Sequence, residues 1–140
     1  MATVVRAVGA VVAGMLVAFI LVIAVELFSA VVHPFPPEFG ETMEEICKHV
    51  ERYPHWVLAV AVPAWAGTAL AGTWIAGRLG NRVSAVFVGL LLVAAVICNT
   101  TMLPYPIWFK IACWIAIPCA IVSGLYLSRR RNVAALNIAE

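Results

Sequence analysis

The sequence predicts an all-α integral membrane protein: four transmembrane helices in an up-down bundle, with a short amphipathic helix in the first outer loop. Of its 140 residues, 64% are hydrophobic and only 11% are charged, whereas a soluble domain carries about 25% charged residues. Four apolar stretches approach or exceed the roughly 20 residues that cross a bilayer. The last three stretches are joined by short connectors, which makes them antiparallel neighbours.

The predicted spans cover residues 7–32, 55–77, 83–103 and 107–127 of a single membrane domain that comprises residues 1–140. A cleaved signal peptide is the alternative for the first span. Its apolar run, however, exceeds the roughly 7 to 15 residues of a signal-peptide core, and Phe28-Ser29-Ala30 is a poor cleavage site. We therefore expect the first span to be a membrane helix.

Basic residues are unevenly divided between the two ends of the predicted bundle. Six lie at one end, namely Arg6, Arg78, Arg82, Arg129, Arg130 and Arg131, and three lie at the other, namely Lys48, Arg52 and Lys110. Lys and Arg beside a span are retained in the cytoplasm, so we expect both termini to be cytoplasmic and the chain to lie in the plasma membrane, the inner membrane of a bacterium. The lipid bilayer is thus the expected partner, and a formal charge of +2 gives no reason to expect nucleic acid.

Small residues recur at every fourth position on the first two spans. They are Ala10, Gly14 and Ala18 on the first, and Ala64, Thr68, Gly72 and Ala76 on the second. Such ridges let the backbones of membrane helices approach closely. We expect them to pack the helices of one chain together, with a homo-oligomer or a larger membrane complex as the alternative.

A proline-rich segment and a lid helix are predicted between the first two spans. The sequence Pro34-Phe35-Pro36-Pro37 cannot continue a helix. Thr42 and Glu45 then match the capping box that begins a helix. Over residues 42–53 the apolar and charged side chains separate onto opposite faces, which is typical of a helix that lies flat on a bundle mouth or on the lipid interface.

Several polar residues reach one level beneath this lid. The candidate binding residues are Glu26, His33, Asn99, Thr100 and Lys110, with His49 at the border of the two faces of the lid helix. Ionisable groups at membrane depth are costly and indicate a functional site by default. Glu26 either faces the bundle, where Lys110 could pair with it, or marks the level at which the helix leaves the lipid. For His33 we expect a solvent-facing position at the helix end.

The sequence contains no recognisable catalytic or metal-binding pattern, and it leaves any cofactor open. The four cysteines, Cys47, Cys98, Cys113 and Cys119, include no C-x-x-C pair, and neither H-x-x-H nor H-E-x-x-H occurs. The disulfide-generating and quinone-reducing families of four-helix membrane enzymes depend on such a C-x-x-C pair. Cys98 and Cys113 lie at similar predicted depth, where a structural disulfide is possible but free thiols are expected.

The layout of four short helices with Glu26 in the first resembles that of the small multidrug exporters, and the resemblance implies a proton-coupled carrier. It is limited to layout, because Glu26 lies near the outer end and the charge bias favours a single orientation. We predict a binding or accessory module for a lipid, a small ligand or a partner helix near the outer leaflet. The carrier is the first alternative, and a membrane enzyme with a metal or thiol site on the outer side is the second.

Overall fold

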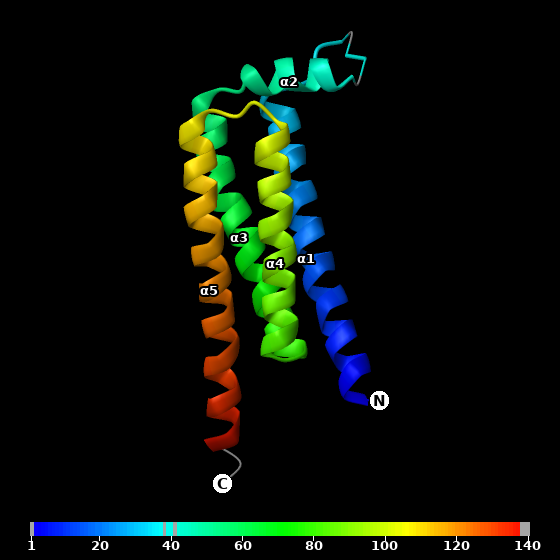
Figure 1. Ribbon diagram of the computed structural model, residues 1–140, viewed down its shortest axis with the longest axis vertical. Helices are drawn as coiled ribbons and strands as arrows, with labels where there is room; N and C mark the ends of the chain where they lie inside the picture. The colour runs from blue at the N-terminus through cyan, green and yellow to red at the C-terminus, as the bar shows by residue number, and fades with distance from the viewer. Residues whose placement is uncertain (1, 38, 41, 138–140) are drawn as a thin grey trace.

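The computed structural model describes the backbone of residues 2–37, 39–40 and 42–137 and the side chains of residues 3–37, 39–40 and 42–129. The described backbone is all-helical and contains no strand. Its helices are α1 (Ala2–Val32), α2 (Met43–Glu51), α3 (His55–Leu79), α4 (Arg82–Met102) and α5 (Ile107–Asn137). Figure 1 shows the four long helices side by side, with α2 lying across the end opposite both termini. The predicted all-α class and the order of its helices are confirmed.

Four helices are long and apolar enough to cross a membrane, and they match the four predicted stretches. α1 begins five residues before the predicted start at residue 7, and α5 continues to Asn137, beyond the predicted end at residue 127. Both extensions are too polar or too close to a chain end to be recognised from hydropathy. Large apolar side chains such as Leu16, Phe19 and Ile20 are more than half exposed on the outside of the bundle, as expected of a surface that faces lipid.

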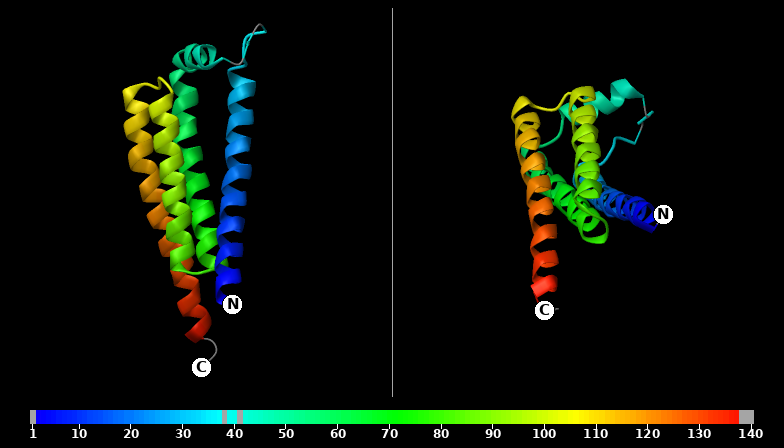
Figure 2. Two further views of the ribbon diagram at one scale, coloured as in Figure 1. Left: turned by 45° about the vertical axis from the view of Figure 1, so that its right-hand side comes forward. Right: turned by 60° about the horizontal axis from the view of Figure 1, so that its bottom comes forward.

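α3 occupies the middle of the bundle, where it packs against α1, α4 and α5. Figure 2 shows it between α1 and α5 in both views. The largest buried cluster joins α3 to α5 and consists of Leu58, Ala61, Ala69, Phe109, Cys113, Ile117 and Ile121. This cluster holds α5 against α3.

α1 and α3 cross closely at the small-residue ridges. A Cβ atom added to Gly14 would lie 2.7 Å from the carbonyl oxygen of Gly72 and 2.9 Å from the Cβ of Ala76. A Cβ added to Gly72 would in turn lie 3.1 Å from the Cβ of Ala18. The prediction that these ridges pack helices of one chain together is confirmed.

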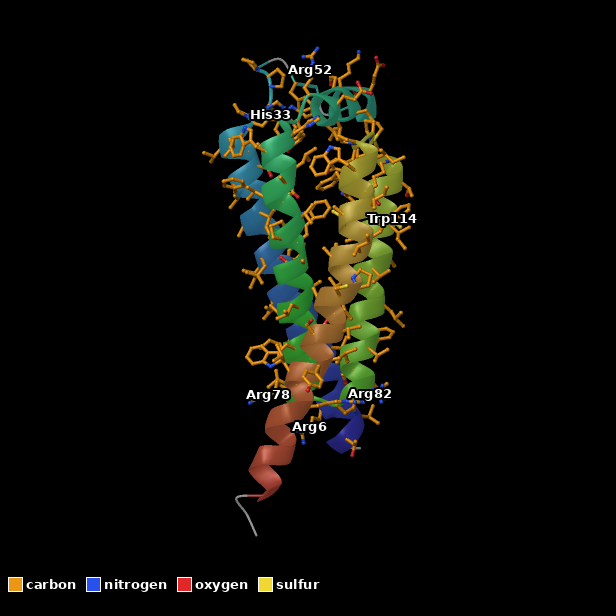
Figure 3. The ribbon with its side chains drawn as sticks, turned by 90° about the vertical axis from the view of Figure 1, so that its left-hand side faces the viewer. Arg6, His33, Arg52, Arg78, Arg82 and Trp114 are labelled. Carbon is orange, nitrogen blue, oxygen red and sulfur yellow. The ribbon has the colours of Figure 1, made fainter. Side chains whose placement is uncertain are left out.

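The end of the bundle that carries both termini is rich in arginine. Figure 3 shows Arg6, Arg78 and Arg82 at this end, and His33 and Arg52 at the other. The Nε of Arg6 donates a hydrogen bond of 2.8 Å to the backbone carbonyl of Leu79, which ties the start of α1 to the end of α3.

α2 begins at the predicted capping box. The Thr42 hydroxyl accepts a hydrogen bond of 3.3 Å from the backbone N–H of Glu45, and the Glu45 carboxylate accepts one of 3.2 Å from the backbone N–H of Thr42. The helix is slightly shorter than the predicted range 42–53, because Thr42 and Arg52 serve as its caps. Lys48 and Glu44 form an ion pair of 2.7 Å on its exposed face.

Candidate functional site

Glu26 and Asn99 line one cleft near the lid end of the bundle. The cleft has a volume of about 160 Å³ and receives side chains from α1, α3, α4 and α5. Its full lining is Val22, Glu26, Trp65, Thr68, Ala69, Leu92, Ala95, Val96, Asn99 and Ile117. We call it the Glu26 cleft. The structure thus brings together two of the predicted binding residues from helices that are far apart in sequence.

The Glu26 cleft opens on the outside of the bundle between α1 and α4. Glu26, Ala95 and Asn99 all line it, and all three are also exposed. Towards the middle of the bundle its walls are the apolar side chains of Val22 and Leu92. The carboxylate and the amide therefore lie at the outer end of a cleft whose other walls, apart from Trp65 and Thr68, are apolar.

A smaller recess adjoins the cleft on the side of the lid, and Glu26 and Trp65 line both. Its volume is about 20 Å³, which is close to the space that a single water needs. Its full lining is Glu26, Ser29, Tyr53, Val57, Leu58, Ala61, Trp65, Tyr105 and Phe109. We call it the aromatic recess. The rings of Trp65 and Tyr105 meet edge to face at 6.4 Å, and those of Trp65 and Phe109 at 5.5 Å.

No cation in the described part of the chain pairs with Glu26. The ion pair between Lys48 and Glu44 on α2 is the only one among residues 3–37, 39–40 and 42–129. Lys110, which could have paired with Glu26, is half-buried at the start of α5 and lines neither the cleft nor the recess. Glu26 is therefore a carboxylate on an apolar helix without a countercharge among the described residues. In a bilayer such a group would be costly unless a proton or a ligand compensated it.

Trp65 adds a second unsatisfied polar group. Its indole N–H is buried and has no hydrogen-bond partner among the described side chains and backbone. A buried donor without an acceptor costs about 1–3 kcal/mol. Glu26 thus lacks a positive charge beside it, and the neighbouring Trp65 N–H lacks an acceptor.

Thr100 belongs to a different contact. It is fully buried, donates a hydrogen bond of 2.8 Å to the carbonyl of Val96, and accepts one of 3.1 Å from Nε1 of Trp114. Trp114 is labelled in Figure 3. Thr100 therefore joins α4 to α5, while its neighbour Asn99 faces the Glu26 cleft.

His33, just past the end of α1, contacts His49 of the lid helix α2. Their rings stack with centroids 4.3 Å apart and planes at 22°, and the ring of Phe35 stacks on His49 at 4.2 Å. Tyr53 approaches His33 at 4.8 Å. The Nε2 atoms of both histidines are buried without a partner among the described residues. His33 lies just past the end of α1, as expected, but it is only partly open to solvent, because the rings of His49 and Tyr53 pack on it.

The surroundings of His49, Tyr53 and Tyr105 favour the neutral form of each side chain. Burial, and then the charge of His33, lowers the pKa of His49. Burial, and then the charge of Glu26, raises the pKa of Tyr53 and that of Tyr105. Both tyrosines therefore keep their hydroxyl protons beside Glu26.

Three grooves are larger than the Glu26 cleft; one of them, of about 240 Å³, lies at the lid and is lined by His33 and His49, and the other two lack comparable chemistry. One, of about 370 Å³, lies between α1 and α3, and the other, of about 340 Å³, lies between α4 and α5. Their linings are almost wholly apolar, with Cys113 as the only titratable side chain in either. Grooves of this kind on an apolar bundle suit acyl chains without selecting a head group.

No group of three His, Cys, Asp or Glu side chains within the described ranges could hold a metal ion. Cys98 and Cys113, which could have formed a disulfide, are free, as are Cys47 and Cys119.

No protein-family model matches the chain, and comparisons with curated proteins and with solved structures gave no match either. The function is therefore inferred from the chemistry of the Glu26 cleft and the aromatic recess.

Trp65, Tyr53 and Tyr105 also line these spaces, although the sequence did not single them out as site residues. Trp65 could have been recognised from its spacing, because it lies four residues after Ala61 and three before Thr68, on the face of α3 that turns inwards.

Proposed function

We propose that this protein is an integral membrane protein that binds a lipid in the Glu26 cleft, through the side of the bundle that opens to the outer leaflet. We further propose that the protein lies in the plasma membrane, which in a bacterium is the inner membrane, with both termini in the cytoplasm. Two observations support the location: four helices can cross a membrane, and Arg6, Arg78 and Arg82 gather at the end that carries both termini.

The observation that carries the proposal is an uncompensated carboxylate at the outer end of an apolar, laterally open cleft. Six residues separate Glu26 from the end of α1 at Val32, which places Glu26 about 9 Å below that end at 1.5 Å per residue. A lipid in the outer leaflet has the same order of groups, because its head lies at the surface and its chains point to the middle of the bilayer. The head would meet Glu26 and Asn99, and a chain would pass along Val22 and Leu92.

A proton-coupled carrier would use the same carboxylate but needs an open route to the other end of the bundle. On that side α1 and α3 cross at Gly14 and Gly72, where a single added carbon would lie 2.7 Å from a carbonyl oxygen. This close crossing favours a site that loads and unloads from the outer leaflet. Proton-linked flux in proteoliposomes, abolished by Glu26→Gln, would instead support the carrier.

Native mass spectrometry in a mild detergent tests lipid binding. The wild-type protein should retain one lipid per chain, and Glu26→Gln should lose most of it, because the head group loses its charged partner. Glu51→Gln is the matched control, since Glu51 is exposed on the lid helix and lines neither space. Equal lipid retention by Glu26→Gln and Glu51→Gln, or a co-purifying partner protein in place of the lipid, would contradict the proposal.

The orientation is tested separately with reporters fused to the C-terminus. A green fluorescent protein fused there should be fluorescent, and an alkaline phosphatase fused there should be inactive in a bacterial host. The reverse result would place Glu26 in the inner leaflet.

A further inference from the structure

Glu26 and Trp65 carry polar groups with different unmet hydrogen-bonding needs. Glu26 is an acceptor with no cation among the described residues, whereas the indole N–H of Trp65 is a buried donor with no acceptor there. Asn99 lines the cleft with both and can donate through its amide. A head group that carries a cation next to an anion would satisfy both Glu26 and the Asn99 amide, whereas a simple cation would satisfy only Glu26.

The recess on the lid side of Glu26 is suited to the cationic part. Besides the carboxylate it is lined by the hydroxyl-bearing side chains of Ser29, Tyr53 and Tyr105. A primary ammonium group has three N–H donors, and these oxygens are acceptors within the same small space. The ring of Trp65 lines it too, and aromatic rings attract cations through their faces.

The size of the recess distinguishes between ammonium groups. A volume of about 20 Å³ holds roughly one water-sized group. A primary ammonium is of that size. A trimethylammonium is several times larger and would require Val57 or Tyr105 to move, although Val57 is fully buried.

The acceptor side of the head group can be placed in the cleft that adjoins the recess. The recess lies towards the lid, Trp65 and Asn99 line the cleft next to Glu26, and Val22 and Leu92 line its apolar part. In an aminophospholipid two carbons join the ammonium to the phosphate, so the phosphate would lie in the cleft when the ammonium lies in the recess. Asn99, which lines the cleft, can donate its amide N–H to that phosphate.

We infer that the lipid bound in the Glu26 cleft is an aminophospholipid with a primary ammonium head, held by Glu26 in the aromatic recess. This deepens the proposed function and rests on it. The occupant is a bilayer lipid, because the cleft opens sideways between α1 and α4 and its walls are apolar.

Lipid competition in nanodiscs tests the inference. The full-length protein is placed in nanodiscs that contain equal amounts of phosphatidylethanolamine, phosphatidylcholine and phosphatidylglycerol with identical acyl chains, and the lipid retained after release is identified by native mass spectrometry. Phosphatidylethanolamine and phosphatidylcholine differ only in the methyl groups on nitrogen. Because charge-assisted hydrogen bonds contribute about 1.5–3 kcal/mol, we expect phosphatidylethanolamine to be enriched roughly tenfold or more over phosphatidylcholine.

The outcomes separate the inference from the proposed function. If one lipid is retained through Glu26 but phosphatidylcholine is retained equally well, the inference is wrong and the proposed function stands. Preferential retention of phosphatidylglycerol also overturns the inference. If no lipid is retained by the wild-type protein, both are wrong.

A variant of the recess wall provides a test that does not alter Glu26. Val57→Ala removes two methyl groups from the wall of the recess and so makes room for a trimethylammonium group. The preference for phosphatidylethanolamine over phosphatidylcholine should therefore fall several-fold. Val60→Ala, on the exposed face of α3, is the matched control and should leave the preference unchanged. An unchanged preference in Val57→Ala would contradict the place assigned to the ammonium group.

Discussion

Replacing Gly14 by alanine should destabilise the bundle, although the same change elsewhere on α1 should not. The added Cβ would lie 2.7 Å from the carbonyl oxygen of Gly72 and 2.9 Å from the Cβ of Ala76, whereas ordinary contacts begin at 3.4 Å. To restore ordinary contact, α1 and α3 would have to separate by about 0.7 Å, or the backbone at the crossing would have to distort. Overpacking of this kind costs about 1–3 kcal/mol.

Gly9 supplies the matched control on the same helix. A Cβ added there meets nothing within 4 Å, and alanine is favoured over glycine inside a helix by about 0.5–1 kcal/mol. Gly9→Ala should therefore be neutral or stabilising. The two variants isolate the close crossing from the helix propensity that both substitutions change.

Thermal unfolding in detergent, followed by circular dichroism or by the loss of monodisperse protein, measures the difference. At about 4 °C for each kcal/mol, Gly14→Ala should unfold several degrees below Gly9→Ala. Equal midpoints for the two variants would refute the close packing of α1 on α3. Gly67→Ala on α3, where the added carbon again meets nothing within 4 Å, should behave like Gly9→Ala.

Three further predictions concern the lid and the contact between α4 and α5. Burial, and then the facing histidine, lowers the pKa of His49. The lid helix should therefore be fully docked above the ordinary histidine pKa of about 6.5. Docking should weaken as the pH falls from about 6.5 towards the lowered pKa of His49 in the folded protein. Amide exchange over residues 43–51, corrected for intrinsic rates, should rise on acidification in the wild type but not in His49→Phe; a pH-independent wild type would contradict this. Thr100→Val removes the acceptor of the Trp114 N–H and should lower stability by about 0.6–1.7 kcal/mol in a detergent unfolding assay, whereas Thr101→Val should have less effect. Thr42→Ala removes the cap of α2 and should increase amide exchange of that helix by an amount equivalent to about 1 kcal/mol, and unchanged exchange would show that packing alone holds the helix.

The features that could be predicted from the sequence are those with local causes. The four long helices follow from uninterrupted apolar runs, the start of α2 follows from Thr42 and Glu45 three residues apart, and the crossing of α1 and α3 follows from small residues at a spacing of four. Each signal lies within one short segment. For that reason the helix order and the small-residue packing were correctly predicted.

The site could be predicted only in part, because it depends on directions around helices. Asn99 and Thr100 are neighbours about 100° apart on α4, and nothing in the sequence indicates which of them faces α1. The cover over His33 depends on the return of the chain at Phe35 and on the position of His49. Such contacts are set by tertiary packing. The sequence therefore indicates at which end of the bundle these residues lie, but not which residues they contact.

Photo-crosslinking with a phosphatidylethanolamine that carries a diazirine in one acyl chain tests the central claim most directly. Lipid bound in the Glu26 cleft should yield adducts concentrated on α1 around Val22 and on α4 around Leu92, and these adducts should be competed by excess unlabelled phosphatidylethanolamine and decrease in Glu26→Gln. Labelling of exposed positions such as Ile115 on α5 should be weak and not competed. Adducts spread evenly over the apolar surface, unaffected by competitor or by Glu26→Gln, would contradict a lipid site at Glu26.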